Sequence, residues 1–314
     1  MEELRKISRR DFIRNSSIAA AALAVGIQPL SAFADSGLVK LTILHTNDVH
    51  SRIEPFPMDG SRNQGLGGFA RRASLVKKIR SEESNVLLLD AGDIFQGTPY
   101  FNMYGGELEF KLMSEMGYDA STMGNHDFDN GIEGFYKQLP HANFPFLVAN
   151  YNFKNTQLDK IVQPYKVFKK SGLKIGVFGL GIQLDGLVEQ KNYGEIQYID
   201  PIETANKYAS ILRNEEKCDL VICLSHLGYK YGNDKVSDHV IAAKTKNIDL
   251  IIGGHTHTFL AEPQDVKNLD GGITTINQVG FAGINVGRVD YYFEANKSKV
   301  RSGSRLYEIS NSIK

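Results

Sequence analysis

The stretch NIDLIIGGHTH (Asn247–His257) decides how this sequence is interpreted, because an apolar run ends at two glycines and two imidazoles follow at once. The run DLIIGG (249–254) is typical of a buried strand. Gly253 and Gly254 permit a sharp turn and a close approach of the backbone. His255 and His257 are two residues apart, so both point to the same side of an extended chain. The stretch therefore predicts a ligand site at the end of a buried strand.

Other strand-like segments of the chain are also followed directly by side chains of the types that can bind metal ions. These side chains are Asp48, His50, Asp93, Asn125, His126 and His226. An isolated Asp after a strand is usually a cap or turn residue, and an isolated buried His is usually a packing residue. Here, however, five of the eight histidines follow strand-like segments. Because ligand sites lie at the carboxyl ends of parallel strands, we expect these side chains to meet.

The types of side chain also indicate which ions would bind. Carboxylate, imidazole and carboxamide groups without a thiolate favour divalent Mn, Fe, Co or Zn over a structural zinc site. The set is larger than one open-site ion needs, and it suits two ions about 3.5–4 Å apart that share a carboxylate. The side chains of these types are Asp48, His50, Asp93, Asn125, His126, His226, His255 and His257.

Short apolar runs alternate with amphipathic stretches from Leu38 onwards, which predicts a layered α/β domain. Strands are expected at 41–46, 86–92, 146–150, 174–181, 219–226 and 249–254. Helices are expected at 68–82, 107–117, 131–138, 201–216 and 234–246. From Gly272 onwards the sequence predicts β-hairpins, with a turn at Asn296 to Lys299.

The composition is that of an ordinary globular protein, with 314 residues, 42% of them hydrophobic and 23% charged. Paired arginines followed by an alanine-rich apolar stretch identify residues 1–34 as a twin-arginine export signal of a periplasmic bacterial protein; an N-terminal membrane-anchoring helix is the alternative. Without these residues the chain holds 31 basic and 33 acidic side chains. This balance indicates neither a nucleic-acid polymer nor a membrane as partner, and no later segment predicts a membrane span. Cys218 and Cys223 are expected to be buried thiols.

Taken in order, the motifs DVH, GD, GNHD, SH and GGHTH resemble those of the calcineurin-like metallophosphoesterases. LTILHTNDVHSRI (Leu41–Ile53) and YDASTMGNHDFD (Tyr118–Asp129) are similar to the two signature stretches of the 5′-nucleotidase family. The resemblance covers essentially all of residues 39–310. It implies a four-layer αββα sandwich, in which two mixed sheets pack face to face between helices.

The resemblance also implies a role for each site residue. Asp48, His50 and His257 would hold one metal ion, Asn125, His226 and His255 the other, and Asp93 would bridge them. His126 would stabilise the transition state or protonate the leaving alkoxide, and Asp129 would orient it. Asp127 stands where most family members have Glu, and we expect little effect from that difference. His45, His141 and His239 match no catalytic position and are expected to be surface or packing residues.

The implied function is hydrolysis of phosphate monoesters, 5′-nucleotides or related nucleotides first, by attack of a hydroxide bound to two metal ions. Family members usually continue into a second, nucleotide-binding domain. We expect residues 35–314 to form a catalytic domain without it, with a separate nucleotidase-domain protein as a partner. The alternatives are a thiosulfonate hydrolase of the sulfur-oxidation type and a non-catalytic scaffold subunit that partners a separate substrate-binding chain.

Overall fold

The computed structural model describes residues 38–313, and Lys40–Lys314 form one compact unit. The predicted export signal at residues 1–34 lies outside the described residues. Within the described part, none of the helices combines the length and the apolar character that a membrane span requires.

The first sheet contains the strand that leads to Asp48. Its strand order is β13-β12-β1-β2-β3. The bounds are β1 (Val39–Thr46), β2 (Val86–Asp90), β3 (Ala120–Ser121), β12 (Asn285–Phe293) and β13 (Lys299–Glu308). Strands β1, β2 and β3 run parallel, whereas β12 and β13 form an antiparallel hairpin. The parallel strands therefore end at the same edge of the sheet.

The second sheet contains the strand that leads to the GGHTH motif. Its strand order is β10-β11-β9-β8-β6-β5. The bounds are β5 (Tyr165–Lys170), β6 (Leu173–Leu180), β8 (Leu220–Ser225), β9 (Leu250–Gly253), β10 (Gln264–Lys267) and β11 (Ile273–Asn277). Strands β6, β8, β9 and β11 are parallel, and the edge strands β5 and β10 are antiparallel to their neighbours. A small separate ladder joins β4 (Tyr151–Asn152) to β7 (Gln197–Tyr198).

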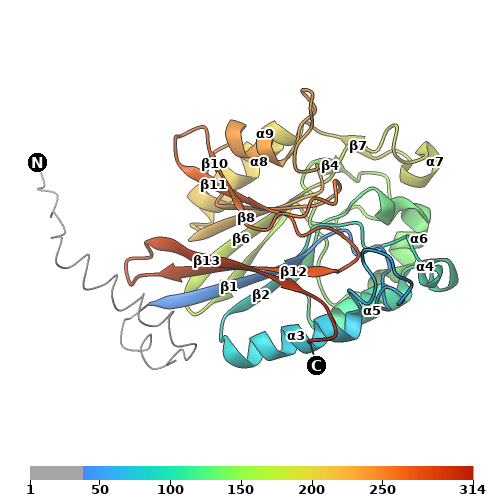
Figure 1. Ribbon diagram of the computed structural model, residues 1–314. Helices are drawn as coiled ribbons and strands as arrows, with labels where there is room; N and C mark the ends of the chain where they lie inside the picture. The colour runs from blue at the N-terminus through green and yellow to red at the C-terminus, as the bar shows by residue number, and fades with distance from the viewer. Residues whose placement is uncertain (1–37, 314) are drawn as a thin grey trace, which may run out of the picture. The chain divides into compact units, whose positions relative to one another are not determined.

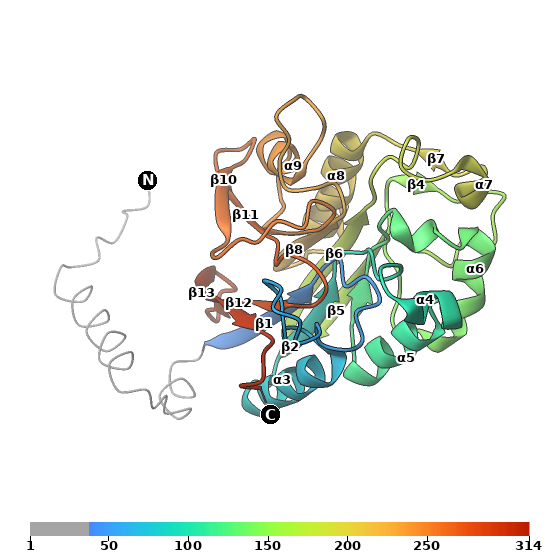
Figure 2. The ribbon, with the colours of Figure 1, turned by 45° about the vertical axis from the view of Figure 1, so that its right-hand side comes forward.

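Helices cover the outer faces of both sheets, as Figures 1 and 2 show. Helices α3 (Phe69–Glu82) and α5 (Glu107–Met116) lie against the first sheet, and α8 (Pro201–Ser210) and α9 (Asp238–Lys244) lie against the second. The remaining α-helices of the described part are α4 (Pro99–Tyr104), α6 (Gly131–Gln138) and α7 (Gln190–Tyr193). The architecture is the predicted four-layer αββα sandwich of mixed sheets.

Alternation along the strands explains the layers. In β1, Leu44 packs with the helices of the first sheet, so the neighbouring Ile43 faces the opposite side of that sheet. In β8, Cys223 packs toward α8 and α9, so Ile222 faces away from them. Strand β8 and the part of β1 from Leu41 onwards are buried on both faces, which is typical of parallel strands between two layers. Both cysteines are free and buried, as expected.

Three predicted elements are wrong in part. Residues 146–150 form no regular strand; Phe146 and Leu147 make only isolated bridges to Ser121 and Gln163. The helix expected at 234–246 begins only at Asp238, because the residues before it belong to the loop after β8. The helix expected at 201–216 is α-helical to Ser210 and then changes to a π-helical turn at Ile211–Glu215.

Candidate metal centre

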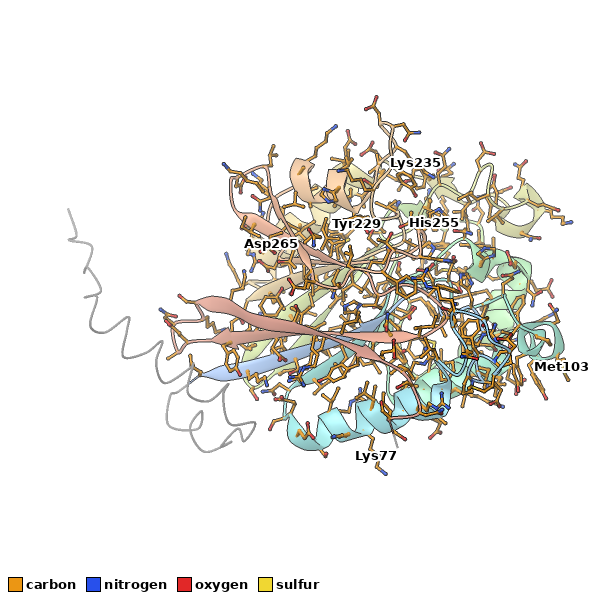
Figure 3. All side chains as sticks on the ribbon, viewed as in Figure 1. Lys77, Met103, Tyr229, Lys235, His255 and Asp265 are labelled. Atoms are coloured by element: carbon orange, nitrogen blue, oxygen red, sulfur yellow. The ribbon has the colours of Figure 1, made fainter. Side chains whose placement is uncertain are left out.

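Side chains from both sheets meet at the carboxyl ends of the parallel strands. Two groups of three possible metal ligands lie there, and within each group the ligand atoms are all within 4.8 Å of one another. The open cluster is Asp48, His50 and His257, and the buried cluster is Asp93, His226 and His255. Figure 3 shows His255 among the loops at this end of the sheets. The structure thus brings together residues that are more than 200 positions apart in sequence.

The open cluster joins the loop after β1 to the loop after β9. The Nε2 atoms of His50 and His257 are 3.0 Å apart, and His257 Nε2 is 3.4 Å from Asp48 Oδ1. His50 Nδ1 lies 3.2 Å from the carbonyl oxygen of Phe95, which can only accept a hydrogen bond. The proton of neutral His50 is therefore on Nδ1, and the lone pair of Nε2 is free to bind a cation.

The buried cluster has the same chemistry with less access to solvent. His226 Nε2 is 3.1 Å from Asp93 Oδ2, yet it has no hydrogen-bond partner of suitable geometry. His226 Nδ1 donates a hydrogen bond to the carbonyl oxygen of Ala91 at 2.7 Å. As in His50, Nε2 is then the ring nitrogen that can bind a cation. Asn125 Oδ1 lies 2.9 Å from His255 Nδ1, so the predicted carboxamide ligand is beside this cluster.

Asp93 belongs to the buried cluster and also faces the open cluster. Its Oδ2 is 3.1 Å from Nε2 of His226 and 3.9 Å from Nε2 of His50. Its other oxygen, Oδ1, accepts the backbone N–H of His126 at 2.8 Å. One carboxylate oxygen therefore faces both clusters while the second fixes its orientation.

The charges in the centre are mutually dependent. Burial would raise the pKa of Asp93, but the nearby imidazoles of His226 and His50 hold it below its ordinary value. Burial lowers the pKa of His226, and the Asp93 carboxylate opposes this and raises it to about 10. Buried carboxylates at this place need positive charge beside them, which an imidazolium or a divalent cation can supply.

Close packing around the donor atoms leaves no room for larger side chains. A Cβ atom at Gly124 would collide with Asp93 Oδ1, and one at Gly254 would lie 2.8 Å from His226 Nδ1. The donor set, the unpartnered Nε2 of His226 and this tight cradle all fit a pair of divalent ions.

The backbone at the site is strained. Asp48, His50, Asp93, His255 and His257 all have a positive φ, between 50° and 71°. Such a conformation costs non-glycine residues on the order of 1–3 kcal/mol each, and it persists where the surrounding structure enforces it. Five of the six residues in the two clusters have this conformation, although it also occurs in other loops, for example at Asn155 and Lys217.

His126 and Asp129 lie next to the open cluster but belong to neither group of ligands. His126 Nδ1 donates to Asp129 Oδ2 at 2.9 Å, and the centre of its ring is 5.3 Å from that of His50. The hydrogen bond to Asp129 raises the pKa of His126 above its ordinary value. His126 is thus an oriented imidazole that holds a proton more readily than a free one.

Asp127 has a structural role that the sequence did not indicate. Its side chain is fully buried. It accepts backbone N–H groups from Asp93 (3.0 Å), Ile94 (2.9 Å), Phe95 (3.3 Å) and Gly124 (2.8 Å). This carboxylate therefore ties the loop of Asp93 to the loop of Asn125. Four backbone donors around one Asp depend on tertiary structure, so no local pattern could have revealed them.

The other three histidines lie outside both clusters. His45 is fully buried, its Nε2 is 2.9 Å from Asn277 Nδ2, and burial lowers its pKa to about 3, so it is a neutral packing residue. His141 and His239 are partly exposed, and His239 contacts the ring of Tyr229.

Comparisons with known proteins agree with this geometry. Residues 41–259 match the family described as calcineurin-like phosphoesterase. A snake venom 5′-nucleotidase of Gloydius brevicauda is 34% identical over 299 residues, which cover 88% of this chain and 49% of that protein. A 5′-nucleotidase of Vibrio cholerae is 34% identical over 305 residues, covering 90% of this chain and 54% of its own length.

A solved structure agrees as well. The crystal structure of a 5′-nucleotidase precursor from Thermus thermophilus matches with a TM-score of 0.78 at 30% identity, covering 88% of this chain and 55% of that one. The chain spans about half the length of the curated relatives it matches. The motifs, the fold and these matches place the chain in the calcineurin-like phosphoesterase family, whose members are metal-dependent phosphoester hydrolases.

Proposed function

We propose that this protein hydrolyses phosphate monoesters, with 5′-nucleotides as the first substrate class. The observation that carries the proposal is Asp93, which belongs to one cluster of metal ligands and faces the other, with the oriented His126 beside them. The names of the relatives from Gloydius brevicauda and Vibrio cholerae support nucleotides as substrates.

The proposed ligand assignment follows the two clusters. Asp48, His50 and His257 would hold one ion, Asn125, His226 and His255 would hold the other, and Asp93 would be shared by both. Divalent Mn, Fe, Co or Zn bound there supplies Lewis-acid stabilisation of phosphoryl charge and lowers the pKa of water. The side chains fix where the phosphoryl group lies, and this positioning accounts for much of the rate in phosphoryl transfer.

His126 completes the site as the proton donor. Its Nδ1–H is engaged by Asp129, so Nε2 is the atom left to face the substrate. A protonated His126 donates from Nε2 to the leaving-group oxygen as the bond to phosphorus breaks. Asp129 holds the ring in place and stabilises the imidazolium, which raises the pKa of His126 and favours the protonated donor.

The test is a substrate screen with the purified chain, stripped of metal and reloaded with Mn, Fe, Co or Zn. We expect phosphate release from nucleoside 5′-monophosphates to be faster than phosphate release from sugar phosphates and faster than ring opening of cyclic nucleotides, which is measured as formation of nucleoside monophosphate. A thiosulfonate is assayed in parallel, and preferential turnover of that compound would favour the sulfur-compound hydrolase instead. The metal-loaded His126→Ala variant controls for contaminating phosphatases.

Protein that binds two ions and hydrolyses none of these compounds would contradict the proposal and favour the scaffold alternative. Adding a separately produced nucleotidase-domain protein tests whether a partner chain supplies substrate affinity.

We also propose that residues 1–34 direct export to the periplasm by the twin-arginine route, on the basis of the paired arginines Arg9 and Arg10. Replacing both with lysine should retain the protein in the cytoplasm. Unchanged fractionation of that variant would contradict this route.

A further inference from the structure

A pocket of about 260 Å³ opens beside the open cluster. Three imidazoles line it, those of His50, His126 and His257, and so do Arg52, Phe56 and Phe281. A substrate that reaches the metal centre from this pocket therefore passes an arginine and two aromatic rings. Arg52 follows His50 by only two residues, so the loop that provides a metal ligand also provides the cation.

Arg52 is held in place by an aromatic platform. Its guanidinium carbon is 4.2 Å from the centre of the Phe56 ring, which is a cation–π contact. Phe56 is fixed in turn, because its backbone N–H donates to Leu66 and its carbonyl oxygen accepts from Gly65, at 2.8 and 2.9 Å. The edge of Phe281 packs against Phe56 with the ring centres 6.4 Å apart. A long flexible side chain is thus restricted to one side of the pocket.

No anionic partner accompanies this guanidinium within residues 38–313. Its Nε is buried and has no hydrogen-bond partner, and none of the described carboxylates pairs with it. Two other arginines of the fold are paired, Arg213 with Asp249 at 2.5 Å and Arg288 with Glu83 at 2.5 Å and Asp290 at 3.0 Å, whereas the fully buried Arg72 also lacks hydrogen-bond partners but does not line this pocket. An unpaired, half-buried guanidinium in a ligand pocket is suited to bind an anion, because a ligand can supply the acceptors that the protein does not.

We propose that Arg52 binds a terminal oxygen of the substrate's phosphoryl group and thereby gives this domain its preference for phosphate monoesters over diesters. The inference rests on the proposed function. A monoester dianion has three terminal oxygens and a second negative charge, whereas a diester has two terminal oxygens and one charge. The planar, positively charged guanidinium group of Arg52 is suited to bind the extra oxygen with its extra charge.

Inorganic phosphate is the first probe, because its binding is measured without turnover. Calorimetry on the metal-loaded full chain compares the wild type with Arg52→Gln. The matched control is Arg62→Gln, which removes an exposed arginine of the same loop region. We expect Arg52→Gln to weaken phosphate binding about tenfold to a hundredfold, since a hydrogen bond between charged groups is lost, and Arg62→Gln to leave it unchanged. Elemental analysis should find the same metal content in all three proteins.

Turnover of two model esters is the second probe. Arg52→Gln should lower kcat/KM for 4-nitrophenyl phosphate by a similar factor and change kcat/KM for bis(4-nitrophenyl) phosphate less than about threefold. Arg52→Lys should recover part of the loss, because it restores the charge without the planar fork.

Three outcomes would overturn the inference: unchanged phosphate affinity in Arg52→Gln, an equal loss on both esters, or a loss of metal from that variant. If the wild type hydrolyses neither nucleoside 5′-monophosphates nor these two esters, the proposed function fails, and the phosphate titration still decides whether Arg52 binds the anion.

Discussion

The two halves of the metal centre use the same chemistry in different surroundings. In the buried cluster, the His226 side chain is fully buried and that of Asp93 is 2% exposed. In the open cluster, the His257 side chain is 41% exposed and faces the pocket. This difference in exposure indicates different roles: the buried cluster is part of the protein core, and the open cluster contacts the substrate.

The support of His257 differs from that of the buried ligands, whereas His50 of the open cluster is also held by a backbone carbonyl oxygen, that of Phe95. His226 is held by the carbonyl oxygen of Ala91, and Asp93 is held by the backbone N–H of His126. His257 instead stacks on the ring of Phe281, with the ring centres 5.1 Å apart and an angle of 11° between the planes. Backbone hydrogen bonds fix an atom more strictly than an aromatic contact at the rim of a pocket, so we expect the open half to bind its ion more weakly.

Asp93→Ala is expected to have the largest effect, because Asp93 is shared by both halves. Each bound ion contributes several kcal/mol of transition-state stabilisation, so losing both should reduce kcat/KM more than about 10⁴-fold. Metal content by elemental analysis and kcat/KM for a nucleoside monophosphate are the measurements. Retention of both ions in this variant would show that the clusters do not depend on a common carboxylate.

His226→Ala and His257→Ala compare the two halves directly. Removing His226 leaves the Asp93 carboxylate buried without its partner, which should lower the free energy of unfolding of the metal-free protein by about 3–5 kcal/mol. Removing His257, which is partly exposed, should cost less than about 1 kcal/mol. Denaturant titration of both variants tests this, and equal losses would remove the distinction between a buried and an open half.

His126→Ala tests whether a residue beside the open half acts on the reaction without holding a metal. General acid catalysis contributes about 10²- to 10⁴-fold, so kcat should fall by that factor while two ions remain bound. In Asp129→Asn, kcat should fall by about tenfold to a hundredfold, because this change weakens a charge-assisted hydrogen bond to the same imidazole. Full activity in His126→Ala would contradict the proton-donor role.

Phe281→Leu is expected to have the smallest effect. Stacking between rings is worth about 0.5–1.5 kcal/mol, so losing it should weaken the ion of the open cluster by up to about tenfold and leave the ion of the buried cluster unchanged. Calorimetric metal titration resolves the two affinities if they differ as proposed. A parallel weakening of both would show that Phe281 supports the whole centre rather than His257.

The apolar pattern of the buried strands predicted a layered α/β domain, and the family resemblance added the four-layer arrangement. Because Asp48, Asp93 and His255 directly follow such strands, the sequence also predicted that these side chains meet. It did not predict the hydrogen bonds by which Asp127 joins two loops, or the contact of Arg52 with the ring of Phe56. Both depend on which loops meet in three dimensions, and single residues such as these carry no periodic pattern. The strand wrongly predicted at 146–150 has the same cause, because an apolar run can be buried without forming a regular strand.

The most direct test of the central claim is anomalous X-ray diffraction from crystals of the metal-loaded protein. The account predicts two anomalous peaks, one beside Asp48, His50 and His257 and one beside His226 and His255, with Asp93 in contact with both. A single peak, or peaks away from these residues, would contradict it.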